Sequence, residues 1–140
     1  MKNMTAEIPA EIRDLYRTVK QNPDSGIALF SDKYTDKEII QMLLSLESEV
    51  ELKEIQSGSA DPGRLADAVQ KLRRDNFYIT TGQKTTDEIA KSLYRLKKKY
   101  NVETAYFYCD ALKDGFISIL TLAAVIGVNV AFPEDEYVVL

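Results

Sequence analysis

Short apolar runs alternate along this chain with longer segments whose apolar residues recur every three or four positions. Apolar runs of about four to eight residues are typical of buried strands, and the wider spacing is typical of amphipathic helices. The predicted strands are Gly26–Ser31, Val50–Gln56, Phe77–Thr81, Glu103–Cys109 and Val128–Phe132, with a short last one at Tyr137–Leu140. The predicted helices cover Pro9–Gln21, Thr35–Leu46, Asp61–Leu72, Thr85–Tyr100 and Asp114–Ile126.

This alternation of strands and helices predicts the α/β fold class. We expect a three-layer, Rossmann-like open sheet that is mainly parallel, with five or six strands and helices on both faces. A length of 140 residues fits one domain. Within it, residues 1–25 form an N-terminal helix and turn, and residues 26–140 form the alternating core.

Composition and charge remove several classes of function. The chain has no histidine and one cysteine, Cys109, which excludes histidine-based catalysis, histidine zinc sites and an internal disulfide. A formal net charge of −4 argues against a general affinity for nucleic acid. The N-terminus has no apolar signal region, and no apolar run is long enough to span a bilayer. We therefore expect a cytoplasmic protein with no membrane partner, no metal and no cofactor.

The segment Phe116–Ile126 is apolar at nearly every position. Such a helix is either covered on all sides by its own core or forms an interface with a second copy. We expect a homodimer through this helix.

Three strand-to-helix loops carry the candidate chemistry. In an open parallel sheet these loops emerge at one edge, outside the carboxyl ends of the strands, where ligands bind. Hydroxyls, a glycine and a lysine at a helix start favour an anionic ligand such as a phosphate. The candidates are Ser31 and Asp32 in the first loop, Thr80, Thr81, Gly82, Gln83 and Lys84 in the third, and Asp110 in the fourth.

A purely structural interpretation of the third loop also stands. Thr85 and Glu88 have the spacing of a capping box, Gly82 suits a turn, and Lys84 suits a solvated surface. The chain contains neither GxGxxG nor GxxxxGK[ST], which argues against a Rossmann dinucleotide site and excludes a P-loop.

The segment NFYITTGQKTTDEIAKSLY resembles part of the CRISPR-associated Rossmann-fold (CARF) domains, where a strand runs into Thr-Gly-Gly-Thr-Lys and a helix. Thr80, Gly82 and Lys84 match, while Thr81 replaces the first glycine and Gln83 the second threonine. Ser31 stands where the family places a small polar residue after its first strand. The resemblance covers about a third of the chain and is a partial motif.

The resemblance implies a homodimer that binds cyclic oligoadenylates in antiviral defence, and in some members cleaves them without metal. Lys84 and Thr80 would contact phosphate or ribose, and Ser31 would line the pocket. Lys84 and Ser31 are then the catalytic candidates, with attack by a ribose 2′-hydroxyl and charge stabilisation by Lys84.

Two other hypotheses stand beside nucleotide binding. One is a non-enzymatic homodimer or partner-binding protein on a Rossmann-like scaffold. The other, weaker one uses the basic residues between Lys71 and Lys99 as a nucleic-acid surface, although such charge runs are more often solvated helix faces.

Overall fold

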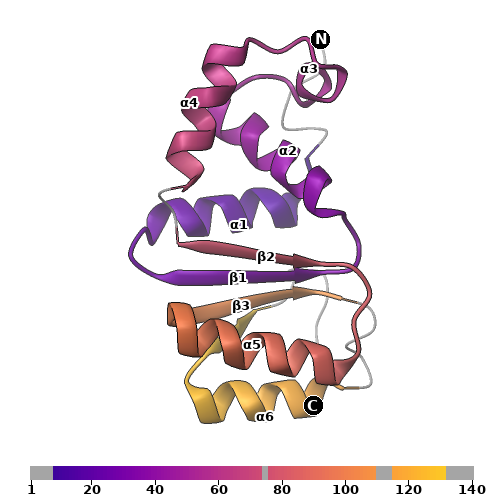
Figure 1. Cartoon of the computed structure of the whole chain (residues 1–140), viewed down its shortest axis with the longest axis vertical. Coiled ribbons are helices and arrows are strands. Elements are labelled where there is room, and N and C mark those ends of the chain that lie inside the picture. Colours follow the sequence, from indigo (N-terminus) through magenta and orange to yellow (C-terminus); the bar gives the residue numbers. More distant parts are fainter. Residues whose placement is uncertain (1–7, 74–75, 110–114, 132–140) are drawn as a thin grey trace. The chain divides into compact units, whose positions relative to one another are not determined.

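A computed structural model describes residues 8–73, 76–109 and 115–131. The chain forms two compact units, Met1–Pro23 with Asp36–Asn76, and Asp24–Thr35 with Phe77–Leu140. The first unit holds helices α1 to α4, and the second holds a sheet with helices α5 and α6 (Figure 1). The prediction of a single domain stays a prediction.

The second unit is built on a parallel sheet with the strand order β2-β1-β3-β4. Its strands are β1 (Gly26–Ser31), β2 (Phe77–Thr81), β3 (Val102–Tyr108) and β4 (Asn129–Ala131). All three strand pairs are parallel. The expectation of five or six strands was therefore wrong for the described residues, which contain four; Tyr137–Leu140 lies outside them.

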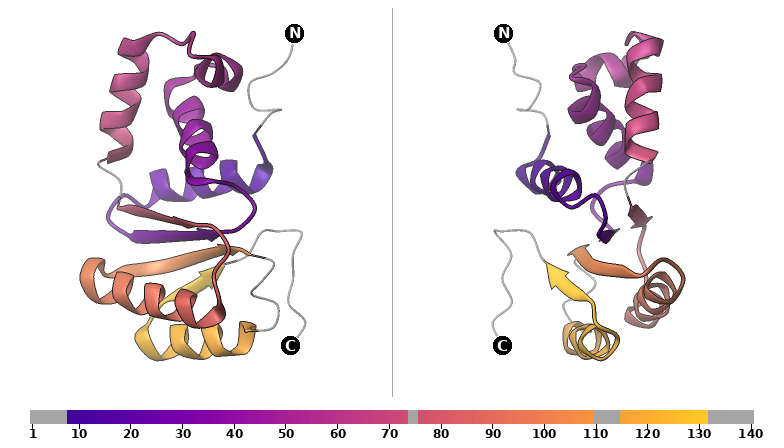
Figure 2. Two further views of the ribbon diagram at one scale, coloured as in Figure 1. Left: turned by 45° about the vertical axis from the view of Figure 1, so that its right-hand side comes forward. Right: turned by 90° about the vertical axis from the view of Figure 1, so that its left-hand side faces the viewer.

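Both helices of this unit pack on the same face of the sheet (Figures 1 and 2). They are α5 (Thr86–Tyr100) and α6 (Phe116–Ile126). Because side chains alternate across a strand, Ala28 and Phe30 point to this face, where they meet Leu93 of α5. The expectation that helices cover both faces stays a prediction.

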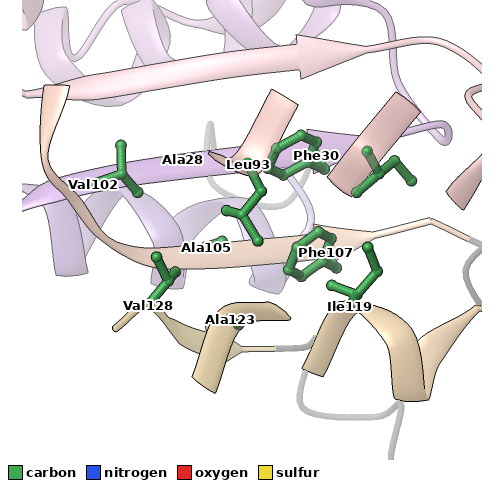
Figure 3. Close-up of a cluster of buried hydrophobic side chains, with 10 residues drawn as sticks. Ala28, Phe30, Leu93, Val102, Ala105, Phe107, Ile119, Ala123 and Val128 are labelled. Atoms are coloured by element: carbon green, nitrogen blue, oxygen red, sulfur yellow. The ribbon is translucent and has the colours of Figure 1, made fainter. Parts of the chain in front are cut away.

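Stacked aromatic rings stand at the centre of this core. Phe30 of β1 and Phe107 of β3 are 5.0 Å apart between ring centroids, with an interplanar angle of 12°. Figure 3 shows Leu93 and Ile119 reaching toward the strands from the two helices. Burial of such side chains contributes about 1.5–3 kcal/mol each, which fixes the two helices on the sheet.

The first unit is helical and centred on α2 (Asp36–Ser48). This helix packs against α1 (Ala10–Gln21), α3 (Leu52–Ser57) and α4 (Pro62–Arg73). Its buried apolar residues, Ile39, Met42 and Leu43, recur at helical spacing.

The predicted strand Val50–Gln56 was wrong, because Leu52–Ser57 forms helix α3. Nearby serines satisfy the backbone that a neighbouring strand would have paired: Val50 N donates to Ser48 Oγ at 3.2 Å, and Ser45 Oγ donates to Val50 O at 2.7 Å. Alternation over seven residues did not reveal these local bonds, which compete with a sheet ladder.

Candidate functional site

The carboxyl ends of β1, β2 and β3 lie side by side, as expected for neighbouring parallel strands. Ser31 is in register with Thr81 on one side and with Tyr108 on the other. The pairing continues past the strand ends, since Gly82 N donates to Ser31 O at 3.1 Å and Asp32 N donates to Tyr108 O at 3.3 Å. The first and third loops therefore leave the sheet at one edge.

A hollow at this edge brings five of the predicted site residues together. About 220 Å³ of empty space, including space open to solvent, lies among its lining residues, but none of it is wide enough for a water-sized sphere. A ligand would have to rest on its rim. The lining residues are Phe30, Ser31, Asp32, Thr80, Gly82, Lys84, Ile89 and Cys109.

Ser31 lies below the surface of this hollow, with only 1% of its area exposed. Its Oγ accepts hydrogen bonds from Lys33 N at 3.2 Å and from Tyr34 N at 3.4 Å. These bonds shape the first loop, because they occupy the oxygen's two lone pairs. Towards a ligand, the Ser31 side chain could therefore act only as a hydrogen-bond donor, through its hydroxyl hydrogen.

Gly82 is needed for its backbone conformation. Its φ of 93° lies in a region that residues with a Cβ rarely adopt, while no heavy atom lies within 4 Å of the place of a Cβ. The exposed backbone of Gly82 is therefore open to an approaching ligand. Lys84, two residues on, is partly buried and lines the same hollow.

Two further predicted site residues, Thr81 and Gln83, do not line the hollow. Thr81 is partly buried in β2 and Gln83 is exposed. Asp110 lies outside the described residues.

The capping box at the start of α5 is confirmed. Thr85 N donates to Glu88 Oε1 at 2.9 Å, and Glu88 N donates to Thr85 Oγ1 at 3.1 Å. The hydrogen bonds from the Thr85 backbone and side chain lower the pKa of Glu88, and the charge of Lys84 lowers it further. The anionic carboxylate thus occupies donors that a phosphate could otherwise use.

Cys109 is a lining residue that the sequence did not assign to the site. Its thiol donates to Phe30 O at 3.2 Å and is partly buried. Its position at the end of β3 could have assigned it to the site, because β3 pairs with β1. This placement is that of a small, partly buried side chain packed at the end of the strand.

The described residues provide neither a metal site nor a membrane span. Among them, no group of three or more cysteine, aspartate or glutamate side chains could hold a metal ion. In the same part of the chain, no helix combines the length and the apolarity that crossing a bilayer requires.

Comparison with known proteins shows the fold. No protein-family model matches this chain, and no curated protein sequence does. The structure resembles a solved ATPase domain, with a TM-score of 0.70 and 15% identity over 86% of this chain and 50% of that one. It also resembles a DnaB-like replicative helicase described with its interactions with primase, with a TM-score of 0.64 and 16% identity over 94% of this chain and 40% of that one.

The likeness is one of fold. At these identities, residue roles do not carry over from the two solved structures to this chain. The chain also spans half or less of the length of the two solved chains.

Proposed function

We propose that this chain is a small-nucleotide-binding domain whose ligand phosphate rests on the turn from Gly82 to Lys84. One observation carries the proposal. Ser31 at the end of β1, Thr80 near the end of β2, and Gly82 and Lys84 in the loop after β2 line one hollow at the carboxyl edge of a parallel sheet. The likeness in fold to a solved ATPase domain supports the ligand class, and open α/β sheets bind ligands at this edge. The absence of GxxxxGK[ST] from the sequence requires a phosphate contact of another kind.

The rim residues fit a phosphate-bearing ligand in different ways. The ammonium of Lys84 offers a charge-assisted hydrogen bond, and the open backbone of Gly82 allows close approach. The Asp32 carboxylate repels phosphate but can accept a hydrogen bond from a ribose hydroxyl. The ligand therefore lies with its phosphate toward Lys84 and a ribose toward Asp32.

The more specific form of the proposal is a cyclic oligoadenylate ligand, which the CARF resemblance suggests. Cleavage would start when a ribose 2′-oxygen attacks the neighbouring phosphorus. That bond closes a 2′,3′-cyclic phosphate, the bond from phosphorus to the 5′-oxygen breaks, and the proton of the 2′-hydroxyl ends on the leaving 5′-oxygen. Lys84 would stabilise the charge on the phosphoryl oxygens. Ser31, buried and bonded to the first loop, would act as a positioning residue.

Binding is tested by equilibrium titration of the full chain with labelled cyclic tri- and tetra-adenylate, ATP and ADP. Lys84→Ala should weaken binding about tenfold to a hundredfold, since a hydrogen bond to a charged group contributes about 1.5–3 kcal/mol. Lys53→Ala is the matched control, because Lys53 is an exposed lysine outside the hollow. Dissociation constants above about 1 mM for every nucleotide would reject the proposal.

A second candidate function is a non-enzymatic interaction scaffold. Ile117 and Val125 on α6 are 63% and 78% exposed, although the same helix buries Phe116, Ile119 and Ala123 in the core. An exposed apolar helix face of this kind favours an interface with a second copy.

A further inference from the structure

A groove between α5 and α6 is independent of the hollow described above. Its volume is about 510 Å³, and nearly all of its exposed lining is apolar. Its uncharged lining residues, here called the floor, are Ala90 and Tyr94 of α5 and Leu122 of α6. Tyr94 is 51% exposed, which makes it the largest accessible side chain of the floor.

Among the described residues, the charged side chains that line this groove are all basic. They are Lys91, Arg95, Lys98 and Lys99. The Lys91–Asp87 pair, at 3.4 Å with both side chains more than 70% exposed, offsets little of this charge in solvent. The groove is therefore locally cationic on a chain whose formal net charge is −4.

The cations follow the helix axis at a regular spacing. Lys91, Arg95 and Lys98 stand four and three residues apart, so they repeat about every 4.5–6 Å along α5. A second helix has the same rise, and acidic side chains at its own three- and four-residue spacing would face them one to one. An apolar stripe beside those acids would cover Tyr94 and Leu122.

We propose that this groove binds an amphipathic helix of another protein, with glutamates or aspartates along one flank and an apolar stripe along the other. Charge complementarity selects this occupant: the cations lie on α5, whereas α6 contributes apolar lining and carries no charged residue. Ala90 allows close approach of the partner backbone, and Tyr94 is the expected anchor. The proposal does not depend on nucleotide binding.

A single-stranded nucleic acid is the competing occupant, since cations and a tyrosine are also its recognition elements. The apolar floor favours the helix, because it offers one aromatic ring for stacking and otherwise aliphatic surface. Nucleic acid is therefore an outcome that the experiment must distinguish.

Fluorescence anisotropy of the full chain with labelled synthetic probes tests the proposal. The first probe is a helical peptide with leucines at helical spacing and glutamates along one flank. Its comparisons are a scrambled peptide of the same composition, a peptide with lysine in place of each glutamate, and an oligo-dT strand. The glutamate peptide should bind at least about tenfold more tightly than either comparison peptide.

Matched variants locate the binding surface. Arg95→Glu with Lys98→Glu should weaken the glutamate peptide at least about tenfold and favour the lysine peptide, and Tyr94→Ala should also weaken the glutamate peptide. Lys53→Glu with Lys71→Glu changes the net charge equally at exposed lysines outside the groove and should leave affinity within about twofold. Circular dichroism establishes that each variant is folded.

Five results would overturn the proposal. The first four are equal binding of the scrambled peptide, equal loss in the control variant, tighter binding of oligo-dT that the groove variant abolishes, and a dimer in sedimentation that the groove variant dissociates. Replacing Glu134, Asp135 and Glu136 with serine tests the chain's own acidic segment as an occupant. A gain in peptide affinity beyond about tenfold would show that this segment already competes for the groove and would also overturn it.

Discussion

Gly115 and Thr86 meet where α6 and α5 begin. A Cβ on Gly115 would lie 2.7 Å from Thr86 Cβ and closer still to Thr86 Oγ1 and Cγ2. Gly115→Ala should therefore destabilise the protein by about 1–3 kcal/mol, because the clash involves a side chain in the first turn of a helix. Urea unfolding followed by circular dichroism measures the change.

Two further variants separate this clash from a general effect of replacing glycine. Gly63→Ala, in the first turn of α4, places its Cβ 3.5 Å from Asp61 Oδ2, an ordinary contact, and should stabilise by about 0.4–1 kcal/mol. Thr86→Ala in the Gly115→Ala background removes two of the three clashing atoms and should restore part of the loss. Additive effects of the two substitutions would contradict a direct contact.

Glu88 makes the stability of the α5 start depend on pH. Its pKa is lowered in the folded state, first by the hydrogen bond from the Thr85 backbone, so its charged form favours folding. That contribution is present above the unfolded pKa of about 4.3 and is lost as pH falls through the lower folded pKa. Glu88→Gln keeps a capping acceptor without the charge.

Thermal unfolding of the original chain and of Glu88→Gln across this range tests the linkage. The original chain should melt at a higher temperature near neutral pH, and the difference should shrink as the pH is lowered below about 4. A difference in melting temperature between the two proteins that stays constant across the pH range would show that the charge of Glu88 does not contribute to stability.

Several residues of the candidate site could be predicted from their place in the sequence. Ser31, Asp32, Thr80, Gly82 and Lys84 follow or end predicted strands, and parallel strands bring their carboxyl ends to one edge. The contact between Gly115 and Thr86 could not be predicted, because it depends on how closely two helix starts approach. The narrowness of the hollow likewise depends on side-chain packing that no spacing encodes.

At the level of elements, helix α6 has apolar residues both in the core and exposed to solvent. Ile119→Ala should cost about 2–5 kcal/mol, since Ile119 is 1% exposed and belongs to the core shared with Phe107. Ile117→Ala, on the same helix with 63% exposure, should change the free energy of unfolding by less than about 0.5 kcal/mol in the monomer. Chemical denaturation at low protein concentration compares the two, and equal losses would contradict the placement of this helix.

The apolar pattern predicted most elements because it reports burial directly. The all-buried strand β1, the capped helix α5 and the apolar helix α6 have long or strongly marked patterns. The pattern was misleading at Val50–Gln56, where an alternation of seven residues belongs to a loop and the short helix α3. There, serine hydroxyls rather than a neighbouring strand satisfy the backbone of Val50.

At the scale of the whole molecule, the chain leaves the sheet unit after Thr35 and returns to it at Phe77. The connection from β1 to β2 therefore contains three helices, α2, α3 and α4, where the sequence predicted a strand between two helices. The sheet has fewer strands than expected in part because Val50–Gln56, predicted as a strand, belongs to this helical connection.

The exposed face of α6 also bears on whether the protein acts as a pair. Ile117 and Val125 lie on a helix without a charged residue, so two copies of this face could meet without burying an unpaired charge. One helix face alone falls short of the roughly 800 Å² per partner of a standard interface, so a weak dimer is expected. Sedimentation velocity over a range of concentrations should show a shift from monomer toward dimer. Ile117→Lys with Val125→Lys should abolish the shift, while Lys53→Glu with Lys71→Glu should preserve it. A monomer at every concentration would contradict dimerisation through this face.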